Sequence, residues 1–352
     1  MAPPQYSLSF DQFRQYAGEG NLVPLYREIL ADYETPVSAF AKIDHGPSAY
    51  LLESIEGGEK WARYSFLGSG SPIVVYEDRG DLLVVQGTRK KRIASCGNPL
   101  ERLREMMDGY RPVTVPDLPP FVGGAVGYLG YDMVRTFEDL AARQKDSLNL
   151  PDFAFLFTDT MLIFDNVAQK IKVVATAHVT VKGERGIKTA YRSATERIER
   201  MITRLRRPLR RMRPHRRRKP VIFTANMSKA DFEKIVVRTK EYIRAGDIVQ
   251  AVVSQRWETN VQAPPLQLYR ALRVVNPSPY MYYLRIAGVE LVGSSPETLV
   301  RCENGVISLR PIAGTRRRGV NLDEDQQMER RLLADEKERA EHVMLVDLGR
   351  ND

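Results

Sequence analysis

Residues 335–352 read DEKERAEHVMLVDLGRND, and the rest of the chain is interpreted outward from them. The charged first part predicts a helix that carries Glu338 and Glu341 on one face, three positions apart. Four apolar residues follow at 343–346, so we expect this turn to be buried all round. Glu341 would then need a cation or donors, and with Glu338 it could hold magnesium. On these residues alone, a solvated surface helix is the commoner explanation.

Composition predicts an ordinary globular protein. The chain has 352 residues with 43% apolar and 9% aromatic side chains, which fits about two domains. No apolar run reaches the roughly 18–20 residues of a membrane span, and the first residues lack a signal-peptide pattern. Cys96 and Cys302 lie far apart and have no metal or redox spacing. We therefore expect a cytoplasmic protein with reduced thiols and no membrane contact.

The net charge of +9 is concentrated in one segment. Residues 204–219 contain ten Lys or Arg and no acidic residue, so the remainder is close to neutral. A basic run interrupted by prolines is typical of a linker, and no aromatic residue interleaves it as single-strand binding would favour. We expect no specific nucleic-acid partner. The predicted organisation is an N-terminal region at 1–203, a linker at 204–219 and a second region at 220–352.

Local patterns in the first region predict a mixture of helices and strands. We expect a helix near 22–33, a strand at 36–43, and a hairpin that turns at Arg79-Gly80. Pro99 suits the first turn of a helix. The segment FAFLFTDTMLIFD predicts one long strand at 153–165, paired with the strand that follows it. The glycines of FVGGAVGYLGYDMVR lack the GxGxxG order, which argues against a dinucleotide fold.

The second region begins with a helix that Ser228 caps and Gly246 ends. The strand DIVQAVVSQRW at 247–257 is apolar on both faces except for Gln250 and its terminal residues. An amide inside a buried strand must find partners, and a structural hydrogen bond is the commoner reason for one. Asn304-Gly305 predicts a hairpin turn.

The loop PIAGTRRRG carries three residues of chemical interest. Gly314 permits close backbone approach. Thr315 offers a hydroxyl, and Arg316 offers a planar cationic fork suited to carboxylates. On its own, such a loop is weak evidence for a ligand-binding site.

Five segments together resemble the chorismate-utilising enzymes: GDIVQAVVSQR, NPSPYMYYL, GSSPETLVR, PIAGTRRRG and DEKERAEHVMLVDLGRND. They are most similar to the large subunit of anthranilate synthase, component I, as are LLES and GGAVGYLGYDMVR in the first region. The resemblance covers nearly the whole chain except the basic run. It implies an α+β fold of two packed antiparallel sheets flanked by helices.

The resemblance also implies a reaction. Ammonia, delivered by a glutamine amidotransferase subunit, would react with chorismate to give anthranilate and pyruvate, with Mg²⁺ required. Glu341 and Glu338 match magnesium-binding positions, and Glu297 matches the general acid that helps the hydroxyl group leave. Gly314 and Thr315 match substrate-contacting positions, and Thr315 is also a catalytic candidate.

Two positions bear on the choice between relatives. Gln250, a further catalytic candidate, falls where relatives that add water carry a lysine base. Ala313 falls where aminodeoxychorismate synthases commonly carry a nucleophilic lysine. Both residues, together with LLES, argue against aminodeoxychorismate and isochorismate or salicylate synthases, which are the alternative enzymes.

The resemblance implies feedback inhibition by tryptophan. The positions that match the inhibitor site are Glu53, Ser54, Pro279, Tyr280 and Met281. A carboxylate for the ammonium group and an apolar wall for the indole are chemically suitable. Family members continue well beyond DLGRND, so we expect a C-terminally incomplete enzyme of low or no activity. A tryptophan-binding fragment without catalysis is the alternative of a different class.

Overall fold

The computed structural model describes residues 5–55, 63–94, 98–141, 148–181, 183–209 and 220–351. The chain divides into two compact units, one within residues 1–210 and 269–352 and the other within 211–268. Cys96 and residues 210–219 of the basic run lie outside the described residues, whereas Cys302 is free and exposed. Among the helices described, none has the length and apolar character needed to cross a membrane.

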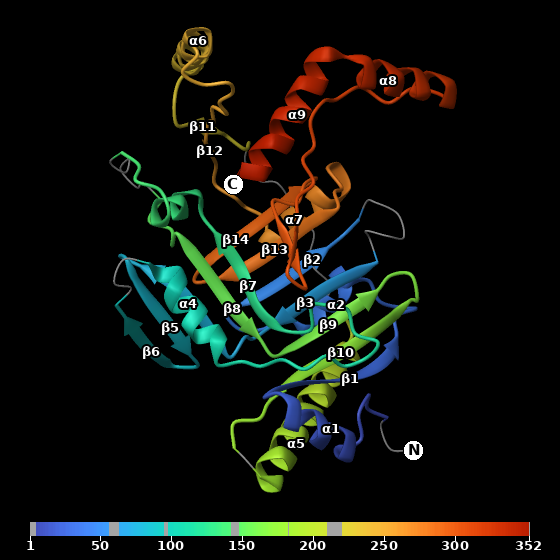
Figure 1. The fold of residues 1–352 in the computed structure, drawn as a ribbon. Coiled ribbons are helices and arrows are strands. Elements are labelled where there is room, and N and C mark those ends of the chain that lie inside the picture. The colour runs from blue at the N-terminus through green and yellow to red at the C-terminus, as the bar shows by residue number, and fades with distance from the viewer. Residues whose placement is uncertain are drawn as a thin grey trace. The chain divides into compact units, whose positions relative to one another are not determined.

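The larger unit is built on a seven-stranded antiparallel sheet in the order β1-β10-β9-β3-β2-β13-β14. Its strands are β1 (Leu22–Leu30), β2 (Ala49–Glu53), β3 (Tyr64–Ser69), β9 (Thr160–Asp165), β10 (Lys170–His178), β13 (Tyr280–Ile286) and β14 (Val289–Ser295). Figure 1 shows the orange β13 beside the blue β2, so segments far apart in the sequence are neighbours in this sheet. The second predicted region therefore supplies two strands to a sheet of the first.

A second antiparallel sheet has five strands in the order β6-β5-β4-β8-β7. These are β4 (Ile73–Asp78), β5 (Asp81–Gln86), β6 (Arg89–Ile93), β7 (Gly124–Leu129) and β8 (Phe153–Thr158). The predicted hairpin at Arg79-Gly80 is confirmed by the β4–β5 pairing. The prediction of one strand over 153–165 is wrong, because the chain leaves this sheet after β8 and enters the first sheet as β9.

The two sheets share an apolar core, which confirms the predicted α+β fold with two packed antiparallel sheets. Tyr50 and Leu284 from the first sheet and Val126 and Leu156 from the second belong to one buried cluster. Fully burying a side chain of this size contributes about 1.5–3 kcal/mol.

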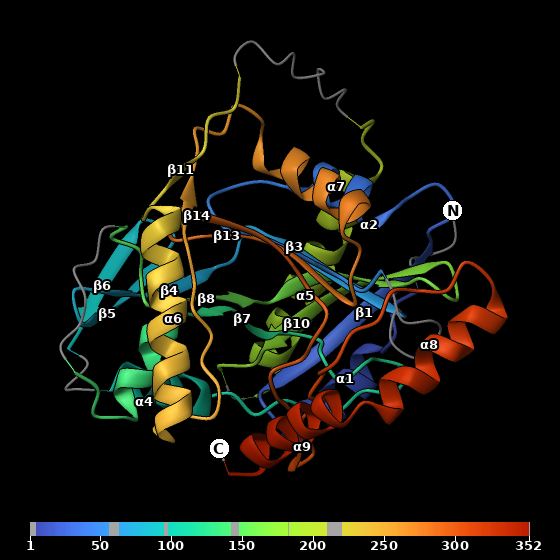
Figure 2. The same cartoon turned by 90° about the horizontal axis from the view of Figure 1, so that it is seen from above.

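Helices cover the outer faces of the sheets. The helix α5 (Glu184–Leu205) packs on β10, and α1 (Phe10–Glu19) lies beside α5 in both views (Figures 1 and 2). The helix α4 (Pro99–Asp108) begins at Pro99 as predicted and places its apolar side on the second sheet. A 3₁₀ helix, η1 (Tyr131–Thr136), follows β7.

Two predictions for residues 22–43 are wrong, because a strand forms where a helix was expected and a helix forms where a strand was expected. Residues expected to be helical form β1, which pairs with β10 along its whole length. The expected strand is instead α2 (Pro36–Ile43). Thr35 and Ser38 form a reciprocal capping box at its start, and Pro36 occupies the first turn. These capping interactions outweigh the β-forming preference of single residues.

The smaller unit contains α6 (Lys229–Ala245) and two short paired strands, β11 (Thr224–Ala225) and β12 (Trp257–Glu258). Ser228 caps α6 and Gly246 ends it with φ +83°, as predicted. The predicted buried strand at 247–257 is wrong, since only its end forms β12. Val249 and Val252 are 77% and 91% exposed, and Gln250 is exposed as well. A strand without paired neighbours is not stable in water.

The last elements are α7 (Pro265–Val275), β15 (Arg301–Glu303), β16 (Val306–Ser308), α8 (Leu322–Ala334) and α9 (Glu336–Asn351). The predicted hairpin at Asn304-Gly305 joins β15 and β16. The prediction of a fully buried turn at 343–346 is wrong: α9 has no buried residue, and Val343 and Val346 are 66% and 40% exposed. The described part of the chain covers too little of this helix to bury its apolar turn.

Gly127 in β7 is a point where the two strands of a pair approach closely. A Cβ there would lie 1.9 Å from the carbonyl oxygen of Ala154, so Gly127→Ala is expected to destabilise the protein by about 1–3 kcal/mol. Denaturant unfolding would measure this. The control is Gly18→Ala in α1, where no atom lies within 4 Å and a gain of about 0.5–1 kcal/mol is expected. Equal losses in both variants would contradict the close approach.

Candidate functional sites

The first candidate site lies where β2 ends beside β13. Glu53 is directly opposite Met281 in the antiparallel register, and both residues are buried. The segments that follow or precede them also touch, because the backbone N–H of Ile55 donates to the carbonyl of Ser278 at 3.2 Å. The structure therefore brings together the two predicted tryptophan-site segments, 53–54 and 279–281.

The carboxylate of Glu53 is held by α7. The hydroxyl of Tyr269 donates to Oε2 at 2.5 Å, and Nη2 of Arg273 donates to Oε1 at 3.3 Å. Tyr269 is fully buried, and burial followed by the charge of Glu53 raises its pKa. Ser54 and Pro279 are half-buried, and Tyr280 is 37% exposed.

Tyr269 and Arg273 were missed by the sequence analysis. They lie four positions apart on α7 and therefore share a face of that helix. That spacing, directly before NPSPYM, was the available signal. Nothing local to α7 indicated that the face would meet Glu53, which is more than two hundred residues earlier.

The second candidate site joins the 311–316 loop to α9. The exposed Glu297 accepts a hydrogen bond from the backbone N–H of Ile312 at 2.9 Å. Gly314 has φ +82°, and a Cβ there would lie 3.0 Å from Oε2 of Glu338. Thr315 is exposed beside it. The predicted residues Gly314 and Glu338 are thus in direct proximity.

Arg316 links this loop to the start of α9. Its Nη1 donates to Glu338 at 2.8 Å, and its Nη2 donates to Asp335 at 2.6 Å. The hydrogen bond to Glu338 is the largest cause that raises the pKa of Arg316. The backbone N–H of Glu338 and the charge of Arg316 lower the pKa of Asp335. The guanidinium fork therefore binds two carboxylates of this chain.

Glu338 and Glu341 suit a hard cation in their chemistry. Glu341 is half-buried, and its carboxylate makes no hydrogen bond or ion pair with another described residue. The described residues contain no group of three or more His, Cys, Asp or Glu that could hold a metal. Because Mg²⁺ often uses one or two protein carboxylates together with waters and substrate oxygens, this pair fits such an ion.

Gln250 belongs to the smaller unit, in a segment with no regular structure. Its exposure differs from the buried amide that was expected. Ala313, which discriminates between relatives, is half-buried in the loop that precedes Gly314.

Comparison with known proteins decides the family. A family model described as chorismate binding enzyme matches residues 58–352. The chain is 44% identical to anthranilate synthase component 1 of Acetivibrio thermocellus over 98% of its own length and 70% of that protein. The same protein of Pseudomonas aeruginosa is 43% identical over 97% and 70%.

This chain belongs to the chorismate-binding enzyme family. Within it, the chain is a homologue of anthranilate synthase component 1. A crystal structure of anthranilate synthase component I from Streptococcus pneumoniae has the same fold, with a TM-score of 0.68 and 30% identity. That alignment covers 92% of this chain and 67% of the solved one.

The family model and the alignments differ in which candidate residues they include. The family model spans the second site, Gln250 and residues 279–281, but begins after Glu53 and Ser54. The alignments with the two anthranilate synthase component 1 proteins extend further toward the N-terminus, since they span 98% and 97% of the chain.

Proposed function

We propose that this chain is the large subunit of an anthranilate synthase. In this role it converts chorismate and ammonia to anthranilate and pyruvate in tryptophan biosynthesis, in the cytoplasm. A glutamine amidotransferase, component II, supplies the ammonia. The observation that carries the proposal is 44% identity to an anthranilate synthase component 1 along 98% of the chain.

The second candidate site is assigned to chorismate. Glu297 is the general acid for the departing hydroxyl group, and Gly314 and Thr315 contact the substrate. Gln250, which belongs to the smaller unit, falls in the sequence where relatives that add water carry a lysine base, and an amide cannot deprotonate water. An amide at this position agrees with ammonia, and not water, as the nucleophile.

Glu338 and Glu341 are assigned to Mg²⁺. The ion would stabilise negative charge on a substrate carboxylate, which is the usual contribution of a bound cation in such a site. The proximity of Gly314 and Glu338 supports one shared site for substrate and metal. Arg316 orients Glu338 by its hydrogen bond at 2.8 Å.

The first candidate site is assigned to inhibitory tryptophan. The half-buried Pro279 provides apolar surface next in sequence to the exposed Tyr280 and the buried Met281, and Ser54 is half-buried at the end of β2. Glu53 is already bound by Tyr269 and Arg273, so an incoming ammonium group would have to share this carboxylate with them. That competition would couple tryptophan binding to the position of α7.

We further propose that the 352-residue chain alone has low anthranilate synthase activity. Gln250 and Glu297 are both exposed, and no described residue of α9 is buried. A reaction that loses a hydroxyl group needs its acid and metal held in a water-poor site. The described residues do not provide such surroundings.

The test is incubation of the purified chain with chorismate, Mg²⁺ and a high ammonium concentration, followed by chromatographic separation of the products. Anthranilate as the sole product, at a low rate, is expected. Aminodeoxychorismate or salicylate would assign the chain to a different reaction of the family. Anthranilate at the rate of the Acetivibrio thermocellus relative, assayed in parallel, would confirm the reaction and contradict the proposed low activity.

Tryptophan binding is tested separately by thermal unfolding. Tryptophan is expected to raise the Tm, since a ligand that binds only the folded state stabilises it. Ser54→Leu should abolish this rise because the added side chain occupies the half-buried site. Ser308→Leu, on the exposed β16, is the matched control and should keep the full rise. An equal rise in both variants would remove Ser54 from the site.

A further inference from the structure

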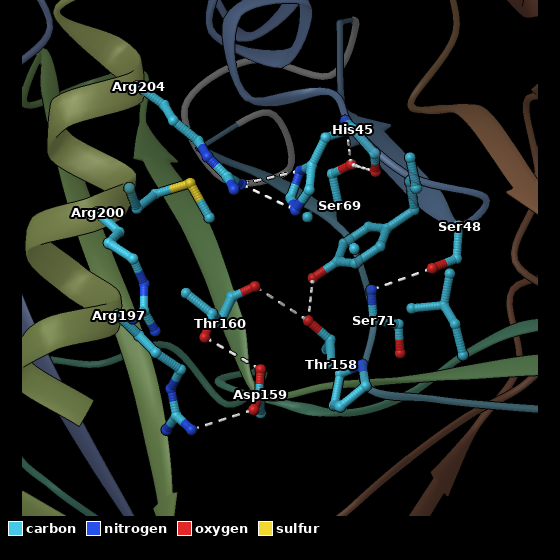
Figure 3. Close-up of a pocket in the computed structure, with 17 residues that line it drawn as sticks. His45, Ser48, Ser69, Ser71, Thr158, Asp159, Thr160, Arg197, Arg200 and Arg204 are labelled. Atoms are coloured by element: carbon cyan, nitrogen blue, oxygen red, sulfur yellow. Dashed lines mark hydrogen bonds and ion pairs between the residues drawn. The ribbon is translucent and has the colours of Figure 1, made fainter. Parts of the chain in front are cut away.

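A pocket of about 230 Å³ in the larger unit shares no lining residue with either candidate site. One wall is α5, which contributes Arg197, Arg200 and Arg204. Figure 3 shows these side chains projecting from the helix toward hydroxyl groups of the facing strands and loops, including Ser69 and Thr158. The spacing of three and four residues places all three arginines on one helical face.

Positive charge in this pocket is only partly compensated. Nη1 of Arg197 lies 3.2 Å from Asp159, the carboxylate among the lining residues, and its Nη2 donates to the carbonyl oxygen of Thr176 at 2.8 Å. Its buried Nε has no hydrogen-bond partner in the described structure. Arg200 makes no hydrogen bond or ion pair with any described residue. Three guanidinium groups therefore face one carboxylate.

Arg204 meets a histidine instead of an acid. Nδ1 of His45 lies 2.8 Å from the carbonyl oxygen of Ile43, so we assign its proton to that hydrogen bond. Nη1 of Arg204 lies 2.9 Å from both ring nitrogens of His45, and with Nδ1 protonated it is Nε2 that can accept from Arg204. Burial lowers the pKa of Arg204, and the positive charges of Arg207 and Arg200 lower it further. Within the part of the chain that the structure describes, Arg204 thus lies near other cations and forms no ion pair with a carboxylate.

The position of these residues near the end of α5 explains only part of the pattern. The dipole of a helix favours a basic residue in its last turn, where Arg204 lies. It does not account for Arg197 and Arg200, which lie about two turns and one turn before Arg204 and line the same pocket. An oxyanion in the pocket would balance the positive charge that these residues leave uncompensated.

We propose that this pocket binds a dianionic phosphate group, either inorganic phosphate or a small phosphate ester, through Arg197, Arg200 and Arg204. Guanidinium forks match phosphate oxygens and bind them with paired hydrogen bonds. A dianion balances the excess of two positive charges, and a tetrahedral group can accept hydrogen bonds from arginines and hydroxyl groups in several directions. The volume exceeds that of one water, about 30 Å³, several-fold.

Isothermal titration of the full chain with inorganic phosphate, at constant ionic strength set with chloride, tests the proposal. Arg200→Gln is expected to weaken binding by about 10- to 100-fold, the usual loss for one charged hydrogen-bonding partner. Arg200 is exposed and unpaired among the described residues, so this variant should keep its fold. A phosphate-dependent rise in Tm, present in the parent and lost in Arg200→Gln, is the second expected result.

The matched control is Arg192→Gln. Arg192 is on the same helix, does not line the pocket, and has a side chain that is 75% exposed. Its substitution removes the same charge and should change phosphate affinity by less than about twofold, as expected for an exposed, screened cation. Equal weakening in both variants would show general charge attraction and overturn the proposal.

The source of the phosphate group is resolved by a second ligand. Tighter binding of glycerol 3-phosphate than of inorganic phosphate would assign the pocket to an ester, and the reverse order would assign it to the free ion. Malonate that binds as tightly as phosphate would overturn the preference for phosphate. Absence of saturable phosphate binding by the parent chain would overturn the site itself.

Discussion

Replacing Glu53 with alanine is expected to lower the free energy of unfolding by about 3–5 kcal/mol, the range for removing one member of a buried charged pair. The change leaves the hydroxyl of the fully buried Tyr269 without its acceptor and Arg273 without its carboxylate. Both lost interactions involve residues of α7, and they hold this helix to the first sheet. Denaturant unfolding followed by circular dichroism would measure the effect.

Glu28→Ala is the matched control for Glu53→Ala. Glu28 also sits on a strand and pairs with two cations, Lys170 and Lys172, but its side chain is 37% exposed. Exposed pairs contribute about 0–1 kcal/mol, so the control should lose far less stability. Similar losses in the two variants would mean that burial does not strengthen the Glu53 interactions.

A double-mutant cycle isolates the contact between Glu53 and Tyr269. Tyr269→Phe alone should cost about 1–3 kcal/mol, because Glu53 loses its closest donor inside the core. In the Glu53→Ala background the same substitution should cost less, since the hydroxyl is then already unsatisfied. Additive losses would argue that the 2.5 Å hydrogen bond contributes little.

Amide hydrogen exchange is expected to differ by several orders of magnitude between two segments that both look like buried strands in the sequence. Residues 247–256 have no strand pairing and should exchange as an open segment, with an opening free energy near zero. β13 lies between β2 and β14 and should open only with the whole fold. Mass spectrometry of peptides from the two segments would compare them directly.

This exchange comparison also bears on the proposed low activity. Slow exchange at 247–256, comparable to that of β13, would mean that the segment is paired and that Gln250 is held in place. One of the structural reasons for low activity, the exposure of Gln250, would then be removed. Rapid exchange that persists with chorismate and Mg²⁺ present would support it.

The features predicted correctly from the sequence are those set by interactions between residues close together in the chain. Ser228 and Gly246 bound α6 correctly, Pro99 began α4, and Asn304-Gly305 turned a hairpin. Each signal acts within a few residues, through a cap, a fixed φ or a positive φ. The number of main sheets followed from the family resemblance.

Features decided by distant partners were not predictable in the same way. The strand β1 exists because β10 pairs with it, although its own residues suggested a helix. The apolar segment at 247–256 shows the converse, since its β-like pattern stays irregular and no strand of the described structure pairs with it. Apolar character indicates a tendency to be buried and does not specify the partner.

The same distinction between local signals and distant partners applies to the candidate sites. Motif matching predicted Glu53 and Met281, and the register of β2 and β13 placed them opposite each other. It did not predict that Tyr269 and Arg273 would hold Glu53, because that contact depends on how α7 packs. The fork of Arg316 was recognised as suited to carboxylates, but its partners proved to be Asp335 and Glu338 of the same chain.

The order of the first sheet has a consequence for biosynthesis. β2 pairs with β3 on one side and with β13 on the other, and its Leu51 is aligned with Tyr283. During translation, β2 therefore has an open edge until β13 leaves the ribosome. Exposed edges of this kind invite pairing with other chains. Newly made chains should thus be most prone to aggregation before residue 286 emerges, and should benefit most from chaperones in that interval.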